Sequence, residues 1–397
     1  MNTTPIQDPK APAGTAPRST LLFFDPLLLL ATLGLAACSL VVLKGATRED
    51  IPGAPDYYVT RQGVYFAVGF VLVAILWRID YSRLRELRYG IYGLLITSIL
   101  AVLALGATAK GAQRAIQLPF FSFQASELGK VLLVITLAAV VVERSRNIGQ
   151  RETTALVMLL ALVPAFFVIA QPDLGSGLVY IVIALAVLFV AGTSWRHFAG
   201  LFALGAVALT LVLVGAPAAG VQVLKPYQVD RLTAFLNPTD NPQKQGYQQL
   251  QSKIAIGAGQ KTGRGERNAT QTKGNFLPEH HTDFIFAVVG ERFGFVGAAL
   301  VLSLYALLIW RALRVLTVAK NLFGALVAGG VVGMLLFQVF VNVGMTLGIM
   351  PITGIPLPLM SYGGSSVLTT LLALGLLQSI HAQGRAASAH KSFGPRL

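Results

Sequence analysis

Long apolar stretches alternate with short polar segments from residue 25 to near the end of the chain. A hydrocarbon core of about 30 Å needs roughly 20 mostly apolar residues per helix, and ten stretches meet this requirement. The pattern therefore predicts an all-α integral membrane protein with about ten transmembrane helices. The predicted spans are residues 25–43, 63–79, 89–107, 125–142, 154–170, 174–192, 198–215, 284–309, 322–347 and 366–381.

The segments between these spans are short except for residues 216–283, between the seventh and eighth spans. Basic residues concentrate in alternate segments, and the positive-inside rule then places both termini in the cytoplasm. We therefore expect a disordered cytoplasmic tail over residues 1–20, a membrane domain over 21–382 with 216–283 as a large extracytoplasmic loop, and a second cytoplasmic tail over 383–397. The basic residues of the short outer segments are Lys44, Arg48, Arg61, Lys110 and Arg114.

Composition agrees with a membrane protein. Hydrophobic residues make up 54% of the 397 residues and charged residues only 12%, against about 25% charged residues in soluble proteins. The net charge of +14 would suggest nucleic acid as the partner of a soluble protein. Here the basic residues are scattered between apolar stretches, so we expect membrane lipids and no nucleic acid as partners.

Several polar side chains lie inside predicted spans, where each is costly and therefore a candidate for function. Glu127 and Lys130 share one helix face at the outer end of the fourth span and can neutralise each other. Their pair either fixes the orientation of the helix or lets Lys130 hold an anionic ligand. Asp173 begins an apolar run, so it is either a helix N-cap or a site residue. Gln338 and Asn342 are expected to join helices through hydrogen bonds.

Residues 344–366 contain too much proline and glycine to continue a regular helix, although apolar sequence flanks them. This composition predicts irregular backbone that lines a cavity. Ser361 and Ser365, with the glycines between them, could offer N–H and hydroxyl groups to a phosphate. The alternative is a turn that only breaks the helix.

The outer loop carries an excess of basic residues, including Arg231 and Lys253, which indicates an anionic partner at the outer surface. An amphipathic helix is expected from about Tyr247. At the end of the loop, His280 and His281 could form a metal cluster with Glu279. However, adjacent histidines tend to point apart in an extended chain and lack the spacing of a helical metal site, so the sequence predicts no dedicated metal centre.

Asp283 lies where this loop meets the eighth span. A lone carboxylate that begins an apolar helix is partly desolvated, which favours its neutral, protonated form and so makes it a better proton acceptor near pH 7. The alternative function for Asp283 is a helix N-cap.

Several short motifs follow one another along the chain. They are Arg61-Gln62, QASELGK from Gln124, QPDLG from Gln171, FLNP from Phe235, GYQQLQSKIAIG from Gly246, FLPEHHTDFIFA from Phe276 and PLPLMSYGGSS from Pro356. Through these motifs the chain resembles, from residue 21 onward, the shape, elongation, division and sporulation (SEDS) family of membrane proteins. Thr270-Gln271 before FLPE and the closing Ser379-Ile380-His381 are more similar to its RodA branch than to its FtsW branch.

The resemblance implies a RodA-like peptidoglycan glycosyltransferase of the bacterial inner membrane, which polymerises lipid II on the outer face during cell elongation and works with a class B penicillin-binding protein. It implies that Asp283 is the essential loop aspartate and that Arg114 is the outer-face arginine. Cavity residues of the family correspond to Arg61, Glu127, Lys130 and Asp173. The chain departs from the family pattern at Ala115, Ala125, Ala258, Gln260 and Arg292.

As a mechanism, we expect Asp283 to take a proton from the acceptor sugar, with inversion at the donor carbon. The leaving undecaprenyl pyrophosphate needs positive charge, for which Arg114, Lys130, Arg231 and Lys253 are the candidates. A divalent cation, Mg²⁺ or Mn²⁺, could share that function. A flippase for the lipid-linked precursor is the alternative, although its essential charges should lie near the bilayer midplane, and a non-catalytic scaffold is a third hypothesis.

Overall fold

The fold is described from a computed structural model over residues 23–109, 112–118, 120–220, 245–274 and 276–393, with the single positions 229 and 235. Within these residues, nine helices are long and apolar enough to cross a membrane. They are α1 (Pro26–Ala46), α2 (Tyr57–Arg78), α3 (Arg88–Leu105), α4 (Ala125–Glu143), α5 (Arg151–Ala170), α7 (Trp195–Thr210, continued by the π-helical turn η4 to Gly215), α12 (Ile285–Val318), α13 (Leu322–Leu347) and α14 (Gly364–Phe393).

A tenth apolar helix, α6 (Leu174–Val190), has 17 residues and completes the ten spans that the sequence predicts. Every predicted apolar stretch is therefore helical, and most differences are at helix ends. The largest of these differences is at the end of α14, which continues through the predicted boundary of the membrane domain at residue 382 to Phe393. The predicted tail over residues 1–20 lies outside the described residues.

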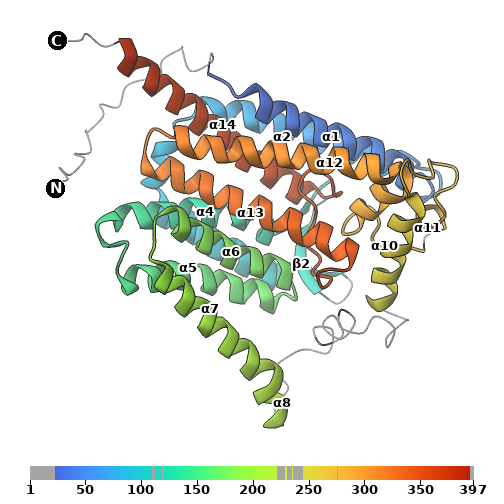
Figure 1. The fold of residues 1–397 in the computed structure, drawn as a ribbon, viewed down its shortest axis with the longest axis horizontal. Helices are drawn as coiled ribbons and strands as arrows, with labels where there is room; N and C mark the ends of the chain where they lie inside the picture. Colours follow the sequence, from blue (N-terminus) through green and yellow to red (C-terminus); the bar gives the residue numbers. More distant parts are fainter. Residues whose placement is uncertain are drawn as a thin grey trace.

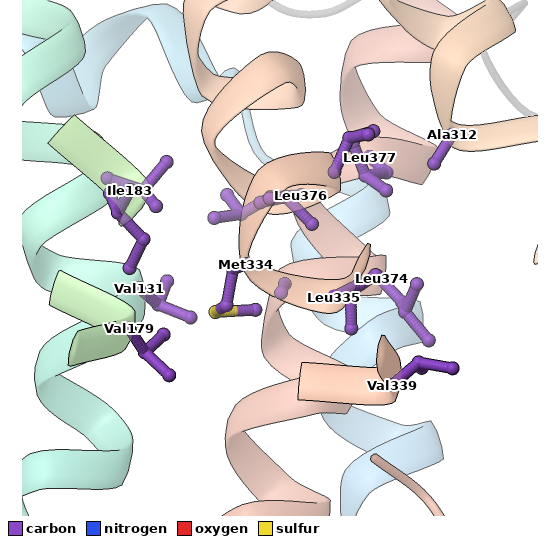
Figure 2. Close-up of a cluster of buried hydrophobic side chains, with 14 of the residues drawn as sticks. Val131, Val179, Ile183, Ala312, Met334, Leu335, Val339, Leu374, Leu376 and Leu377 are labelled. Carbon is purple, nitrogen blue, oxygen red and sulfur yellow. The ribbon is translucent and has the colours of Figure 1, made fainter. Parts of the chain in front are cut away.

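The core of the bundle lies where α4, α6, α12, α13 and α14 meet. Val131 of α4 and Ile183 of α6 face Met334 of α13, and Leu374 and Leu377 of α14 lie beyond it (Figure 2). In contrast, α7 is almost entirely exposed and extends away from the other helices, together with the short α8 (Ala216–Ala218) (Figure 1). Because its exposed residues are apolar, α7 suits a lipid environment.

The start of α1 and the end of α14 lie on the same side of the bundle. Asp25, the N-cap of α1, exchanges two backbone–side-chain hydrogen bonds with Gln378 of α14, and its carboxylate pairs with Arg311 of α12. Asp25 is fully buried. Its ion pair and its hydrogen bonds together hold α1, α12 and α14 to one another at one end of the molecule. An even number of membrane crossings requires that the first and last spans begin and end on the same side of the membrane, as they do here.

The opposite end carries α10 (Gln245–Gly259), α11 (Thr270–Lys273) and a small sheet (Figure 1), whereas η2 (Tyr81–Arg85) and η3 (Ser145–Asn147) lie at the end that carries Asp25. Helix α10 packs against α12 and α13, which confirms the helix predicted from about Tyr247. The antiparallel sheet, which the sequence did not predict, joins α3 to α4. Its strands are β1 (Ala107–Ala109), β2 (Ala112–Gln117) and β3 (Ser122–Phe123).

Helix α12 is broken at Gly294, whose φ of 63° and ψ of −157° are not helical. The backbone of residues 260–265 crosses α12 at this point. The N–H groups of Arg264 and Gly265 donate to the carbonyls of Glu291 and Arg292, while Gln260 and Lys261 accept from the two residues after Gly294. The predicted span over 284–309 is therefore helical but interrupted at Gly294, where a distant loop supplies the hydrogen bonds that the break removes.

Candidate active site

Asp283 is the last polar residue of a turned segment, 277–284, that leads into α12, and its side chain is partly exposed. The segment is held by its backbone. The carbonyl of His281 accepts from Tyr362 N–H, at 2.9 Å, and that of Thr282 accepts from Ser361 Oγ, at 2.6 Å. The carbonyl of Asp283 accepts from Asn342 Nδ2 at 2.9 Å. Three consecutive carbonyls are thus anchored to α13 and to the connection that precedes α14.

That connection, residues 348–363, is non-helical and largely buried, which confirms the irregular backbone predicted for this part of the chain. Its Gly354 has a φ of 74°, and a Cβ added there would lie 3.6 Å from Asp283 Oδ2. A Cβ on Gly175 of α6 would lie 2.8 Å from the carbonyl oxygen of Thr353. The start of α6 and the carboxylate of Asp283 therefore both lie close to residues 353 and 354 of this connection.

An aromatic group borders the turn. The ring of His281 lies 4.7 Å from that of Tyr58 and 6.0 Å from that of Tyr362. Burial, with a smaller contribution from Tyr65, raises the pKa of the Tyr362 phenol, so this side chain is neutral near pH 7. The guanidinium of Arg61 lies 4.4 Å above the ring of Tyr57. Flat apolar faces beside a cation suit a sugar and a charged group.

The Arg61-Gln62 pair has two separate functions. Gln62 is fully buried; its amide donates to the carbonyl of Ser361 at 3.1 Å, and its oxygen accepts from Gly363 N–H at 3.3 Å. Arg61 remains partly exposed above Tyr57. Gln62 thus fixes the connection that holds Asp283, whereas Arg61 lies partly exposed over an aromatic ring.

A second polar group lies buried between α4 and α6. Lys130 and Glu127 form an ion pair, with side chains 1% and 3% exposed, which confirms the pairing predicted from their spacing. Asp173 caps α6 by accepting from Ser176 N–H, which confirms its N-cap function. Its second oxygen accepts from Gln124 and from Ser126 Oγ.

Ser365 connects the two groups. Its hydroxyl donates to the carbonyl of Ser122 and accepts from Gln124 N–H. Ser361 donates to Thr282 and accepts from Leu357 N–H. Both hydroxyls are therefore engaged with the backbone, and their predicted binding of a phosphate stays a prediction.

Lys253 reaches across the end of α13. Its side chain is exposed and passes so close to Gly348, a left-handed residue with a φ of 77°, that a Cβ there would collide with it. Helix α10 is held in this position because Ser252 Oγ donates to the carbonyl of Thr346 and because Ala255 packs in a small core with Leu277 and Phe284. The ammonium of Lys253 is thus placed at the end of the molecule that carries Asp283.

Two predicted cations fall wholly or partly outside the described part of the chain. Arg231 lies outside the described residues, and Arg114 lies in β2, with a side chain outside the described part of the chain. Sequence reasoning also missed contacts that support the site. The buried carboxylate of Glu291 accepts from Thr272 N–H and Oγ1 and from Gln271 N–H, and so holds α11 on α12. The one available signal was an acidic residue inside a predicted span.

Among the described residues, one group has the composition of a metal site: Asp50, His280 and His281. In the metal cluster considered from the sequence, Glu279 is the carboxylate partner of the two histidines. Instead, Glu279 Oε2 accepts from Thr282 Oγ1, and the partner is Asp50 from the connection between α1 and α2.

Comparison with known sequences gives a match over most of the chain. Residues 20–386 match the FtsW/RodA/SpoVE family, described as cell cycle protein. The chain is 37% identical over 364 residues to the peptidoglycan glycosyltransferase MrdB of Escherichia coli K12. The matched region covers 92% of this chain and 95% of MrdB. The chain is 34% identical to the peptidoglycan glycosyltransferase RodA of Treponema pallidum, over 91% of this chain and 98% of that protein.

Solved structures give the same result. A chain from a study of how a peptidoglycan synthase complex coordinates polymerization and crosslinking matches with a TM-score of 0.76 and 34% identity, and covers 91% of this chain and 99% of its own. The crystal structure of the rod shape determining protein RodA of Thermus thermophilus matches with a TM-score of 0.65 and 31% identity, over 91% of this chain and 97% of that one.

Proposed function

The chain belongs to the FtsW/RodA/SpoVE family of cell cycle proteins, and we propose that it is a peptidoglycan glycosyltransferase that polymerises lipid II into β-1,4 glycan strands. Relatives of similar length carry that enzyme name, and the chain covers more than nine-tenths of each of the two named above. The proposal includes the inner membrane of a bacterium as its location, with Asp283 on the extracytoplasmic side.

In the proposed reaction, the carboxylate of Asp283 accepts the proton of the 4-hydroxyl of the acceptor N-acetylglucosamine. The oxygen attacks the anomeric carbon of the donor N-acetylmuramic acid, and the bond from that carbon to the pyrophosphate breaks. One C–O bond forms on the face opposite to the one that breaks, so the configuration inverts from α to β. The proton ends on Asp283 and the electron pair on undecaprenyl pyrophosphate.

The observation that carries this function for Asp283 is the anchoring of its turn. General base catalysis requires a carboxylate within hydrogen-bond reach of the reacting hydroxyl, and a misplacement of about 1 Å can cost about 100-fold in rate. The hydrogen bonds from Tyr362, Ser361 and Asn342 hold the backbone on both sides of the Asp283 side chain, while that side chain stays partly exposed.

Positive charge beside the leaving pyrophosphate is the second requirement, because fixed charges stabilise the negative charge that develops there. Lys130 is matched by Glu127 in a buried pair, so its net contribution is small. Lys253 on α10 is exposed, and Arg61 above Tyr57 is partly exposed. We assign binding of the pyrophosphate to these two residues, together with Arg114 and Arg231. A Mg²⁺ or Mn²⁺ ion bound to the pyrophosphate itself would add to this charge.

A class B penicillin-binding protein is the proposed partner. One structural neighbour comes from a complex that couples polymerization to crosslinking, and a polymerase whose product must be crosslinked gains from a transpeptidase beside it. A flippase is disfavoured because Asp283 lies at one end of the bundle, whereas transporters place their coupling residues near the midplane.

The deciding experiment uses the purified full-length protein, its class B partner and labelled lipid II. We expect glycan ladders from the wild type and a loss of about 100-fold or more for Asp283→Asn, with the same thermal stability for both proteins. Ladders of wild-type yield from Asp283→Asn would remove the carboxylate from the reaction. Lipid II translocation without any polymer from the wild type would instead favour the flippase.

A further inference from the structure

Three side chains that can bind a metal meet between the α1–α2 connection and the turn that carries Asp283. Nε2 of His280 lies 3.1 Å from Asp50 Oδ2, and Nδ1 of His281 lies 3.9 Å from the same oxygen. All the ligand atoms lie within 4.8 Å of one another. The side chains are 6%, 12% and 20% exposed for His280, Asp50 and His281 respectively.

The orientation of His280 is set by its other nitrogen. Nδ1 lies 3.1 Å from the carbonyl oxygen of Leu277, so this nitrogen carries the proton and donates it. In a neutral ring, Nε2 then holds a lone pair that points at the carboxylate of Asp50. Two acceptors do not face each other at 3.1 Å unless a cation or a proton lies between them. A histidine that donates one N–H to a carbonyl and binds metal through the other nitrogen is the usual arrangement in metal sites.

We propose that Asp50, His280 and His281 bind one transition-metal ion of the Zn²⁺ type. Two imidazole nitrogens and one carboxylate oxygen suit Zn²⁺, which takes nitrogen and oxygen ligands at about 2.0–2.2 Å, whereas Mg²⁺ prefers oxygen ligands alone. Ligand atoms around a tetrahedral ion of that size are about 3.4 Å apart, close to the 3.1 and 3.9 Å observed here. A water molecule would take the fourth position.

The ion can reach this site from outside. Asp50 lines a cavity of about 410 Å³ between the end of α1 and residues 266–273. The charged side chains in its walls, besides Asp50, are Arg48, Glu49, Glu266, Arg267 and Lys273. A partly hydrated cation can therefore approach Asp50 without crossing the apolar core.

Metal binding at this position would join two connections that are 230 residues apart in the chain. One of them carries Asp283, two residues after His281. The ion would add a fourth anchor to the turn, beside the hydrogen bonds from Ser361, Tyr362 and Asn342. We infer a positioning function for the ion, separate from any cation bound to pyrophosphate.

The test is metal binding by the full-length protein in detergent, stripped with a chelator and then titrated with Zn²⁺ alone, without lipid II. We expect one Zn²⁺ per wild-type chain, a rise in unfolding temperature on addition of Zn²⁺, and visible absorption bands of a tetrahedral site on addition of Co²⁺. Asp50→Asn and His280→Asn should each weaken binding by at least about 10- to 100-fold and abolish the temperature rise. His280→Asn keeps a donor toward Leu277, so its turn should fold.

Asp56→Asn is the matched control, because Asp56 is an exposed carboxylate of the same α1–α2 connection and does not line this cavity; it should bind Zn²⁺ like the wild type. Less than one-tenth of a Zn²⁺ per wild-type chain would overturn the proposal and leave a plain His280–Asp50 ion pair. Equal Zn²⁺ binding by the wild type and both ligand variants would overturn it too, because the ion would then lie elsewhere. Neither result depends on the proposed polymerase activity, since no substrate is present.

Discussion

The amide of Asn342 joins the turn that carries Asp283 to the connection before α14. Its Nδ2 donates to the carbonyl of Asp283 at 2.9 Å and to that of Ile355 at 2.8 Å, and the residue is fully buried. One side chain therefore fixes the backbone at Asp283 relative to the connection before α14.

Asn342→Leu should lower the polymerisation rate by about 10- to 100-fold, because Leu keeps the volume but removes both donors and lets the carboxylate shift. Gln338→Leu is the matched control: Gln338 is buried on the same face of α13 one turn earlier, and its oxygen has no hydrogen-bond partner among the described residues. Initial rates of glycan synthesis measure the effect. Equal rates for the two variants would show that Asn342 does not position Asp283.

The buried pair of Glu127 and Lys130 gives a second prediction at this scale. Lys130→Met or Glu127→Gln alone removes one partner; Lys130→Met leaves a buried charge unpaired, which costs about 3–5 kcal/mol. The double variant should be more stable than Lys130→Met, because no unpaired charge remains. Thermal unfolding of the four proteins in one detergent completes the cycle. Purely additive losses would mean that the two side chains do not interact.

At the scale of the element, the break in α12 depends on Gly294. Its backbone conformation suits glycine alone, and a Cβ there would lie 2.4 Å from the nitrogen of Gly263. Gly294→Ala should therefore destabilise the protein by about 1–3 kcal/mol and loosen the loop over residues 260–265. Gly93→Ala in α3, where a Cβ meets nothing within 4 Å, should leave the unfolding temperature unchanged or higher. Equal temperatures for the two variants would contradict the assigned strain.

The elements show how far the sequence predicts this fold. The ten spans follow from apolar length, a local property, and the structure forms a helix at each of them. The break at Gly294 does not follow, because the apolar run continues through it and its cause is a loop about 30 residues away. The irregular connection before α14 was predicted because proline and glycine act locally.

The site divides in the same way. The spacing of Glu127 and Lys130 and the position of Asp173 before α6 were sufficient to predict their pairing and capping. The approach of Asp50 to His280 was not predictable, because two connections far apart in sequence meet only when α1, α2 and α12 have packed. The expectation that adjacent histidines point apart failed for the same reason, since Asp50 lies within reach of both rings.

For the whole molecule, the testable property is its orientation in the membrane. In a Cys38→Ala background, Glu266→Cys and Arg146→Cys place single thiols at exposed positions of opposite ends. A membrane-impermeant maleimide should label Glu266→Cys in intact spheroplasts, and Arg146→Cys only after lysis. Labelling of Arg146→Cys alone in intact spheroplasts would invert the proposed topology and place Asp283 in the cytoplasm.

The anchors of residues 281–283 come from α13 and from the backbone before α14. A bulky lipid-linked precursor could therefore enter, and a spent carrier leave, while these contacts keep the proposed proton acceptor, Asp283, in place. A growing polymer would advance, one disaccharide at a time, past a stationary point in the bilayer surface.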